Sequence, residues 1–313
     1  MKFSKAIIFC AFTSAALTGC NPEEWPGAGS DYNLVSQDGG YNGIGGAHFN
    51  GWVNNAYGPA STFIPVLKDH PPLYGATICI IEHPEYPCAI TGEDGSFDFY
   101  GIPNENVHLA ISLTGYMPLI IPYAPAQGDY ENHPAVEIPS LSLQDMMYSQ
   151  INTSYVAGTG GMSFHITNKP DLLADPLAED HSEASTGRPG VAVRYRRIYT
   201  NSSGVESFGG WSNPSSWILG HNVVYLNNDE SPEIGALHTA NSGLGISLNL
   251  VPGDYEVEAD DTNYSGGFGT LLTTKHWDCW PVNKSIIGSN AKRARTKVVD
   301  GHLSDVRMYC NKS

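Results

Sequence analysis

The sequence predicts an all-β protein with two tandem antiparallel β-sandwiches that follow a flexible N-terminal segment. Glycine, proline and tyrosine are abundant, at 34, 21 and 17 of 313 residues, whereas runs of strong helix formers are sparse. Short apolar runs also alternate with turn residues along most of the chain, which is typical of many short strands.

The first twenty residues have the features of an export signal. Two lysines precede an apolar stretch at residues 6–17, which is too short to span a bilayer as a helix. The four residues LTGC that end at Cys20 resemble the bacterial lipobox, in which the cysteine is lipidated and becomes the first mature residue. We therefore expect residues 1–19 to be a lipoprotein signal peptide and Cys20 to carry the lipid. A simple signal peptide with an incidental cysteine is the alternative.

The expected lipid and the segment after it indicate a location and a tether. Several acyl chains anchor a protein stably, because each buried methylene contributes about 0.8 kcal/mol. Asn21 stands where an aspartate marks inner-membrane retention in enterobacterial lipoproteins, so we expect the outer membrane. Residues 20–70 are rich in Gly, Asn and Pro and predict a tether, although Phe49 and Trp52 indicate that part of it packs on the first sandwich.

The first sandwich is expected over residues 71–158. Its strands include ATICII at residues 76–81 and VHLAISL at residues 107–113. Between them, TGEDGSFDF at residues 91–99 combines an Asp-Gly turn with two phenylalanines that point to one face of the next strand.

The second sandwich is expected over residues 159–313, as a diverged copy of the first. Residues 223–226 would be its early strand, and TANSG at residues 239–243 repeats the spacing of TGEDG at residues 91–95. The segment LVPGDY at residues 250–255 then follows, much as GIP follows in the first copy, and two matches in the same order indicate a repeat. Flanking strands are expected at residues 162–167, 191–199, 295–299 and 303–310.

These motifs resemble the carboxypeptidase regulatory-like domain, a transthyretin-type, immunoglobulin-like β-sandwich. Its pattern runs T-x-x-D-G-x-F-x-F, L-P-x-G-x-Y, and G-Y after the next strand, and residues 91–99, 115–116 and 250–255 match parts of it. Residues 104–106 replace the usual glycine turn, and Val107 stands in place of the tyrosine. The resemblance implies a scaffold without catalytic residues, because nothing in the chain resembles the His-x-x-Glu zinc motif of metallocarboxypeptidases.

Cysteine usage agrees with export. Beyond Cys20, four cysteines form two sequence-local pairs, which predict the disulfides Cys79–Cys88 and Cys279–Cys310. In the loop-entropy model these closures contribute roughly 2.5 and 3.5 kcal/mol. A zinc site is excluded by spacing, because no two of these cysteines lie close enough together in the sequence.

Charge is distributed unevenly. Residues 21–150 hold one basic residue, Lys68, against 15 acidic ones, whereas residues 151–313 hold 13 against 17. The polyanionic first half disfavours nucleic acids and anionic lipid head groups, so no nucleic-acid partner is expected. The basic cluster at residues 292–297 could contact an anionic glycan, lipopolysaccharide or the acidic first sandwich, or could charge an edge strand.

Candidate catalytic and metal-binding groups all have structural alternatives. The segments EHPE at residues 82–85 and DHSE at residues 180–183 lack a third partner at a recognisable spacing, so we expect no enzymatic activity. Two acidic clusters could bind calcium, but such side chains also stabilise turns, and no metal site or cofactor is predicted. The carboxylates in these clusters are Glu93, Asp94, Asp98, Glu258, Asp260 and Asp261.

Tryptophans are the candidate ligand-binding residues. Trp211 and Trp217 lie in a segment rich in Gly, Ser and Asn, and Trp277 and Trp280 flank Cys279. Such residues fit a sugar platform, because sugar C–H faces stack on indole rings while polar neighbours bind the hydroxyls. The alternative for Trp277 and Trp280 is that they cover the disulfide.

The sequence therefore predicts a membrane-anchored envelope or cell-surface lipoprotein that acts as a non-catalytic structural or protein-interaction module. Its expected partners are the membrane, through lipidated Cys20, and envelope proteins or glycans. A carbohydrate-binding lipoprotein is the first alternative, and a hydrolase with an unrecognised site is the second.

Overall fold

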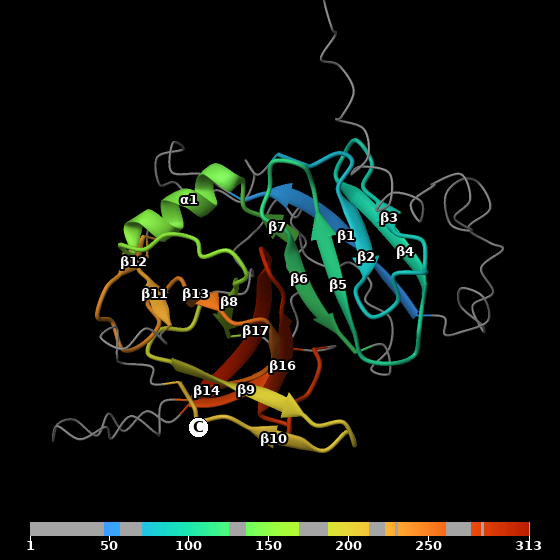
Figure 1. The fold of residues 1–313 in the computed structure, drawn as a ribbon. Helices are drawn as coiled ribbons and strands as arrows, with labels where there is room; N and C mark the ends of the chain where they lie inside the picture. The colour runs from blue at the N-terminus through green and yellow to red at the C-terminus, as the bar shows by residue number, and fades with distance from the viewer. Residues whose placement is uncertain are drawn as a thin grey trace, which may run out of the picture.

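The computed structural model describes residues 47–56, 71–124, 136–168, 187–212, 223–228, 231–260, 277–282 and 285–312. The expected signal peptide, Cys20, Trp217 and residues 180–183 lie outside these ranges. Within them nearly all regular structure is strand (Figure 1). In chain order, the elements are β1 (Ala47–Asn55), β2 (Thr77–Ile80), β3 (Ala89–Ile90), β4 (Ser96–Ile102), β5 (Val107–Ser112), β6 (Leu119–Tyr123), β7 (Val136–Ile138), α1 (Leu141–Gln150), β8 (Gly160–Thr167), β9 (Ala192–Thr200), β10 (Glu206–Phe208), β11 (Val224–Leu226), β12 (Pro232–Glu233), β13 (Leu244–Leu250), β14 (Gly253–Asp260), β15 (Trp277–Pro281), β16 (Arg293–Val298) and β17 (Leu303–Lys312).

The strands form two sandwiches, and the predicted all-β fold is confirmed. In the first sandwich, the sheet β4-β1-β7 packs on β3-β2-β5-β6 around a core that includes Phe49 and Leu109. In the second, the sheet β10-β9-β14-β16 packs on β12-β11-β13-β8-β17 around a core that includes Phe164 and Val257. Each core collects every second residue of its strands, because successive strand side chains point to opposite faces.

The two sandwiches share one sheet of ten strands. Strand β6 of the first pairs with β17 of the second through Leu119 with Leu303 and Ile120 with Ser304, and the Leu303 N–H donates to the Pro118 carbonyl at 2.8 Å. This pairing is parallel, as are β17 with β8 and β1 with β7, which departs from the expected antiparallel order. Parallel neighbours require long connections, and β7 and β17 each return beside the first strand of their own sandwich.

The shared sheet changes its covered face at this junction. Leu303, at the start of β17, packs with Leu119 in the first core. Val306 and Met308 point to the opposite face of the same strand and pack in the second core. The first three-stranded sheet and the four-stranded sheet therefore cover opposite faces of the shared sheet, one at each end.

A buried threonine occupies the same place in both sandwiches and shows that they follow one plan. Thr91 Oγ1 accepts from the Ala76 N–H at 2.9 Å and donates to the carbonyl three residues before Ala76. Thr239 Oγ1 accepts from the Val191 N–H at 3.1 Å and donates to the carbonyl three residues before Val191. The repeat indicated by the TxxxG spacing is therefore a repeat of structure.

Strand order repeats as well, and it corrects one prediction. The pairings among β1, β2, β4, β5 and β7 match, in partner and direction, those among β8, β9, β13, β14 and β17. The early strand of the second copy is therefore β9, and the assignment of residues 223–226 to this role is wrong. Those residues form β11, which pairs with β13 and extends the other sheet.

Strand β1 lies inside the segment expected to be a tether. Its residues alternate between buried and half-buried positions, and Phe49 and Val53 are fully buried in the first core. The first sandwich thus begins at Ala47 and not at residue 71, so the predicted boundary is corrected. The remainder of the expected tether, residues 20–46 and 57–70, lies outside the described residues.

Helix α1 connects the sandwiches and was not predicted. Ser140 caps it, since its Oγ accepts from the Leu143 N–H at 3.2 Å. Met147 of the helix packs on a small cluster that includes Val224 and Ile246 of the shared sheet. Among the described residues, no helix has the length and apolarity needed to cross a bilayer.

Replacing either buried threonine by valine should destabilise the chain. Thr91→Val or Thr239→Val keeps the side-chain shape but leaves one buried N–H and one carbonyl without partners, at a cost of about 1–3 kcal/mol. Urea unfolding would measure the loss. Thr77→Val and Thr200→Val are strand controls, one in each sandwich, and should change the free energy of unfolding by no more than about 0.5 kcal/mol. Equal losses in test and control variants would contradict the assigned role.

Candidate functional site

A dense group of charged side chains lies on the outer face of the four-stranded sheet. Its register places Glu258 on β14 between Arg194 of β9 and Arg293 of β16. The Glu258 carboxylate lies 2.6 Å from Arg194 Nη2 and 2.7 Å from Arg293 Nε. Glu256, two residues earlier, stands opposite Arg196 and binds its Nη2 at 2.6 Å. The strands therefore build an alternating lattice of charges, which stabilises cross-strand pairing.

Glu256 is the buried centre of this lattice. Its side chain is 0% exposed and also accepts from the Ser289 backbone N–H. Burial by itself raises the pKa of Glu256, but the hydrogen bonds from Ser289 and Arg196 outweigh it, and the net shift is downward. The Glu256 carboxylate is therefore ionised, and Arg196 and the Ser289 N–H stabilise its charge.

Trp211 covers the lattice. The segment after β10 continues along β9, with the Ser212 N–H donating to the Tyr195 carbonyl at 2.7 Å. This places the indole ring 4.7 Å from the guanidinium carbon of Arg194, 4.5 Å from that of Arg196 and 5.1 Å from that of Arg293. One ring face that could stack on a sugar is thus engaged with cations of the same chain.

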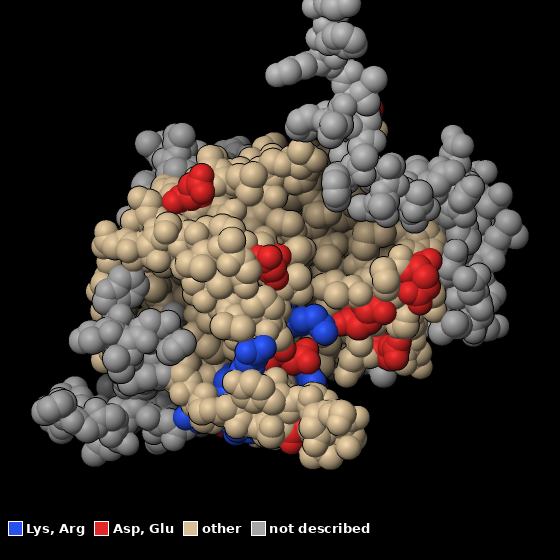
Figure 2. Space-filling model, viewed as in Figure 1, with Lys and Arg blue, Asp and Glu red and all other residues tan. Residues whose placement is uncertain are grey.

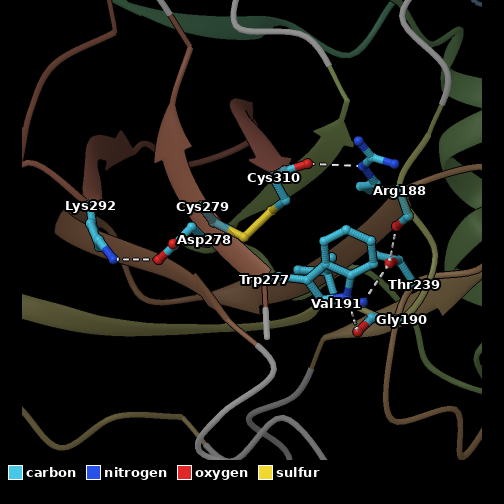
Figure 3. The surroundings of a disulfide bond; sticks show 9 residues. All are labelled: Arg188, Gly190, Val191, Thr239, Trp277, Asp278, Cys279, Lys292 and Cys310. Carbon is cyan, nitrogen blue, oxygen red and sulfur yellow. Dashed lines mark hydrogen bonds and ion pairs between the residues drawn. A yellow bond between two sulfur atoms is a disulfide. The ribbon is translucent and has the colours of Figure 1, made fainter. Parts of the chain in front are cut away.

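Trp277 borders the second disulfide. Cys279 and Cys310 are bonded with their Cα atoms 4.1 Å apart, as predicted. The Trp277 Nε1–H donates to the Gly190 carbonyl at 3.1 Å, and Arg188 lies over the ring at 5.1 Å (Figure 3). The ring packs against the second core, which matches the alternative interpretation that it covers the disulfide.

Trp280 faces away from Trp277, because the two residues lie an odd number of positions apart on β15. Its ring stacks on Tyr309 with 5.4 Å between centroids, and Lys292 Nζ lies 5.3 Å from it. Trp277 and Trp280 therefore do not form one platform. Because Trp217 lies outside the described residues, the sugar-binding role of the tryptophans stays a prediction.

The predicted basic cluster is part of a general pattern. Every lysine and arginine with a described side chain has an ion-pair or hydrogen-bond partner, and Figure 2 shows the basic side chains bordered by acidic ones. Within the cluster, Lys297 Nζ lies 3.5 Å from Asp254 and 3.5 Å from Glu82 of the first sandwich. The basic cluster therefore contacts the acidic first sandwich, which is one of the alternatives that the sequence left open.

Glu82 and His83 have different partners. The Glu82 carboxylate accepts from the His108 backbone N–H at 2.8 Å and lies 2.8 Å from His108 Nδ1. Burial opposes ionisation of Glu82, but the hydrogen bonds from His108 lower its pKa to about 2. His83 instead bonds with Glu85 and Glu105, and these bonds raise its pKa. The structure thus joins Glu82 to a histidine that the sequence did not indicate.

Three of the acids considered for calcium take part in other bonds. Asp94 accepts from both the N–H and the hydroxyl of Ser96, at 3.0 and 2.6 Å, and so stabilises its turn. Asp98 pairs with His48 at 3.0 Å, and Glu258 belongs to the arginine lattice. Across the described ranges, no set of three or more His, Cys, Asp or Glu side chains is arranged to hold a metal ion.

Comparison with known proteins identifies no family. No protein-family model and no curated protein matches the chain. Among solved structures, the minor pilin GBS52 of Streptococcus agalactiae aligns at 12% identity over 85% of this chain and 96% of that chain, with a TM-score of 0.23. The shaft pilin SpaA of Lactobacillus rhamnosus GG aligns at 10% identity over 85% and 98%, with a TM-score of 0.21. TM-scores this low do not establish a common fold.

Removing the buried charge at the lattice centre should be costly. Glu256→Gln leaves Arg196 without its ionised partner under Trp211, and breaking such a buried pair costs about 3–5 kcal/mol. Asp278→Asn is the matched control, because Asp278 pairs with Lys292 at 2.7 Å with both side chains about half exposed. We expect the control to cost less than about 1 kcal/mol. Chemical unfolding would measure the loss of unfolding free energy in each variant. Similar losses in the two would contradict a stabilising role of the lattice.

Acid should remove the contribution of Glu82 to the stability of the folded protein. Its pKa in the folded protein is about 2, below its ordinary value of 4.5, so its stabilising effect is present above about pH 4.5 and fades towards pH 2. Glu82→Gln should therefore destabilise the chain near neutral pH and lose this effect in acid. Urea midpoints across that range would measure it, and a difference that stays constant with pH would contradict the assignment.

Proposed function

We propose that this chain is a lipid-anchored bacterial envelope protein whose two sandwiches act as one rigid, non-catalytic unit that connects or presents other envelope components. The shared ten-stranded sheet is the observation that supports this role most directly. Strand β17 is bonded to β8 in its own sandwich and to β6 in the other, so the sandwiches cannot turn independently without breaking a backbone ladder.

Side chains of the described part support a structural role further. The ion pair between Glu82 and Lys297 connects the two sandwiches. The arginine lattice stabilises the outer face of the four-stranded sheet, and Trp211 packs over that face. Both disulfides brace strands of the shared sheet, as fits a domain that must persist outside the cytosol. The LTGC sequence at Cys20 supplies the proposed anchor.

Cys20→Ala should release the protein from membranes. The wild-type chain, expressed in a bacterium fed labelled palmitate, should carry the label and sediment with membranes, because two or more acyl chains anchor stably. The variant should lose the label and appear in the soluble periplasmic fraction with both disulfides formed. Cys10→Ala, within the expected signal, is the control and should leave labelling intact. Label that persists in Cys20→Ala would refute the anchor.

Rigidity can be tested by a distance between the sandwiches. Spin labels on unnatural residues at Tyr74 and Val205, which are 69% and 61% exposed, leave the native cysteines undisturbed. Pulsed electron resonance on the chain from residue 21 onwards should give one narrow distance distribution. A broad distribution would contradict a rigid unit.

A further inference from the structure

The loop between β2 and β3 is closed at its base by a disulfide. Cys79 lies in β2 and Cys88 directly precedes β3, with their Cα atoms 4.5 Å apart. The loop between them is internally braced, because His83 bonds to Glu85 and stacks on Tyr86, which is 6% exposed. The chain from residue 81 to residue 87 is therefore a short, fixed projection from the first sandwich.

Glu82 in this loop contacts two strands, one in each sandwich. One carboxylate oxygen accepts from the backbone N–H of His108 on β5, and the other lies 2.8 Å from His108 Nδ1. The second oxygen also lies 3.5 Å from Nζ of Lys297 on β16, in the other sandwich. His108 is 7% exposed and its Nε2 has no hydrogen-bond partner among the described residues, so Glu82 alone fixes the ring.

The backbone part of the junction near this loop is short. The ladder between β6 and β17 consists of two residue pairs, and beside it the first core takes in Leu303 and Val282 of the second sandwich. Lys297 has a second acidic neighbour, Asp254, in its own sandwich. When Glu82 moves away, Lys297 keeps a partner, and so separating the Glu82–Lys297 pair has a modest cost.

We propose that residues 81–87 are a latch between the sandwiches, and that the Cys79–Cys88 disulfide holds Glu82 where it binds Lys297. This inference rests on the proposed rigid unit and proposes that one loop strengthens the contact between its two sandwiches. Without the disulfide, the loop gains many conformations and Glu82 is no longer held against His108 and Lys297.

The latch responds to the thiol chemistry of its surroundings. A dithiol reductant delivers two electrons and two protons to the sulfur atoms, Cys79 and Cys88 become thiols, and the dithiol becomes a disulfide. Reduction then loosens the junction, whereas an oxidising compartment closes the loop and engages the latch. In an exported protein, the latch therefore engages only after translocation.

The spin-labelled chain described above tests this directly, with labels at Tyr74 and Val205. Glu82→Gln and the double variant Cys79→Ser/Cys88→Ser should each broaden the distance distribution, and combining them should broaden it no further. Amide exchange at Ile120 and Ser304 should quicken about fivefold, the factor that a partly exposed ion pair contributes. Glu93→Gln, an exposed acid of the first sandwich outside this loop, is the control and should keep the wild-type width.

Each outcome distinguishes the latch from the rigid unit. A narrow distribution in the wild type that stays narrow in Glu82→Gln and in the serine variant would overturn the latch and leave the rigid unit standing. A broad distribution in the wild type would overturn the rigid unit itself. If the serine variant does not fold, graded dithiothreitol on the native chain, with the opened disulfide identified by mass spectrometry, gives the same comparison. Broadening that follows only Cys279–Cys310 reduction would refute the latch.

Discussion

Strand β17 bonds to strands of both sandwiches, and the rest of the structure depends on this pairing. Its first residues pair with β6 of the first sandwich, and its whole length up to Tyr309 pairs with β8 of the second. Leu303 packs in the first core, while Val306 and Met308 pack in the second. One period-2 strand thus supplies both cores from opposite faces, which two separate domains connected by a linker could not do.

Charge is used in two ways around this strand. Inside the second sandwich, arginines and glutamates alternate across β9, β14 and β16 and are desolvated under Trp211, where unpaired charges would be costly. At the junction, Glu82 and Lys297 meet as a single pair with moderate exposure. The lattice therefore stabilises a surface, whereas the pair connects two bodies. This difference explains why the basic cluster does not present free cations to a ligand within the described residues.

Part of the site could be read from the chain, and part could not. Both disulfides follow from local pairing of cysteines, and the acids of β14 flanked by arginines in RYRR and RARTK are a period-2 charge pattern that could have indicated the lattice. His108 gave no such signal, because one histidine in an apolar strand has no pattern. Its partner Glu82 lies 26 residues away and is brought to it only by the pairing of β2 with β5.

The sequence by itself determined the strand-rich fold, the two-copy plan and the disulfides, because these depend on composition, local spacing and short loops. It missed β1, whose glycine- and asparagine-rich surroundings concealed its alternation, and α1, which has a weak apolar face. Only the tertiary structure decided that the two copies share a sheet, because two pairs of backbone groups far apart in sequence make that contact. Backbone pairing of this kind carries little side-chain signature, and so the junction and the role of Glu82 became visible only in three dimensions.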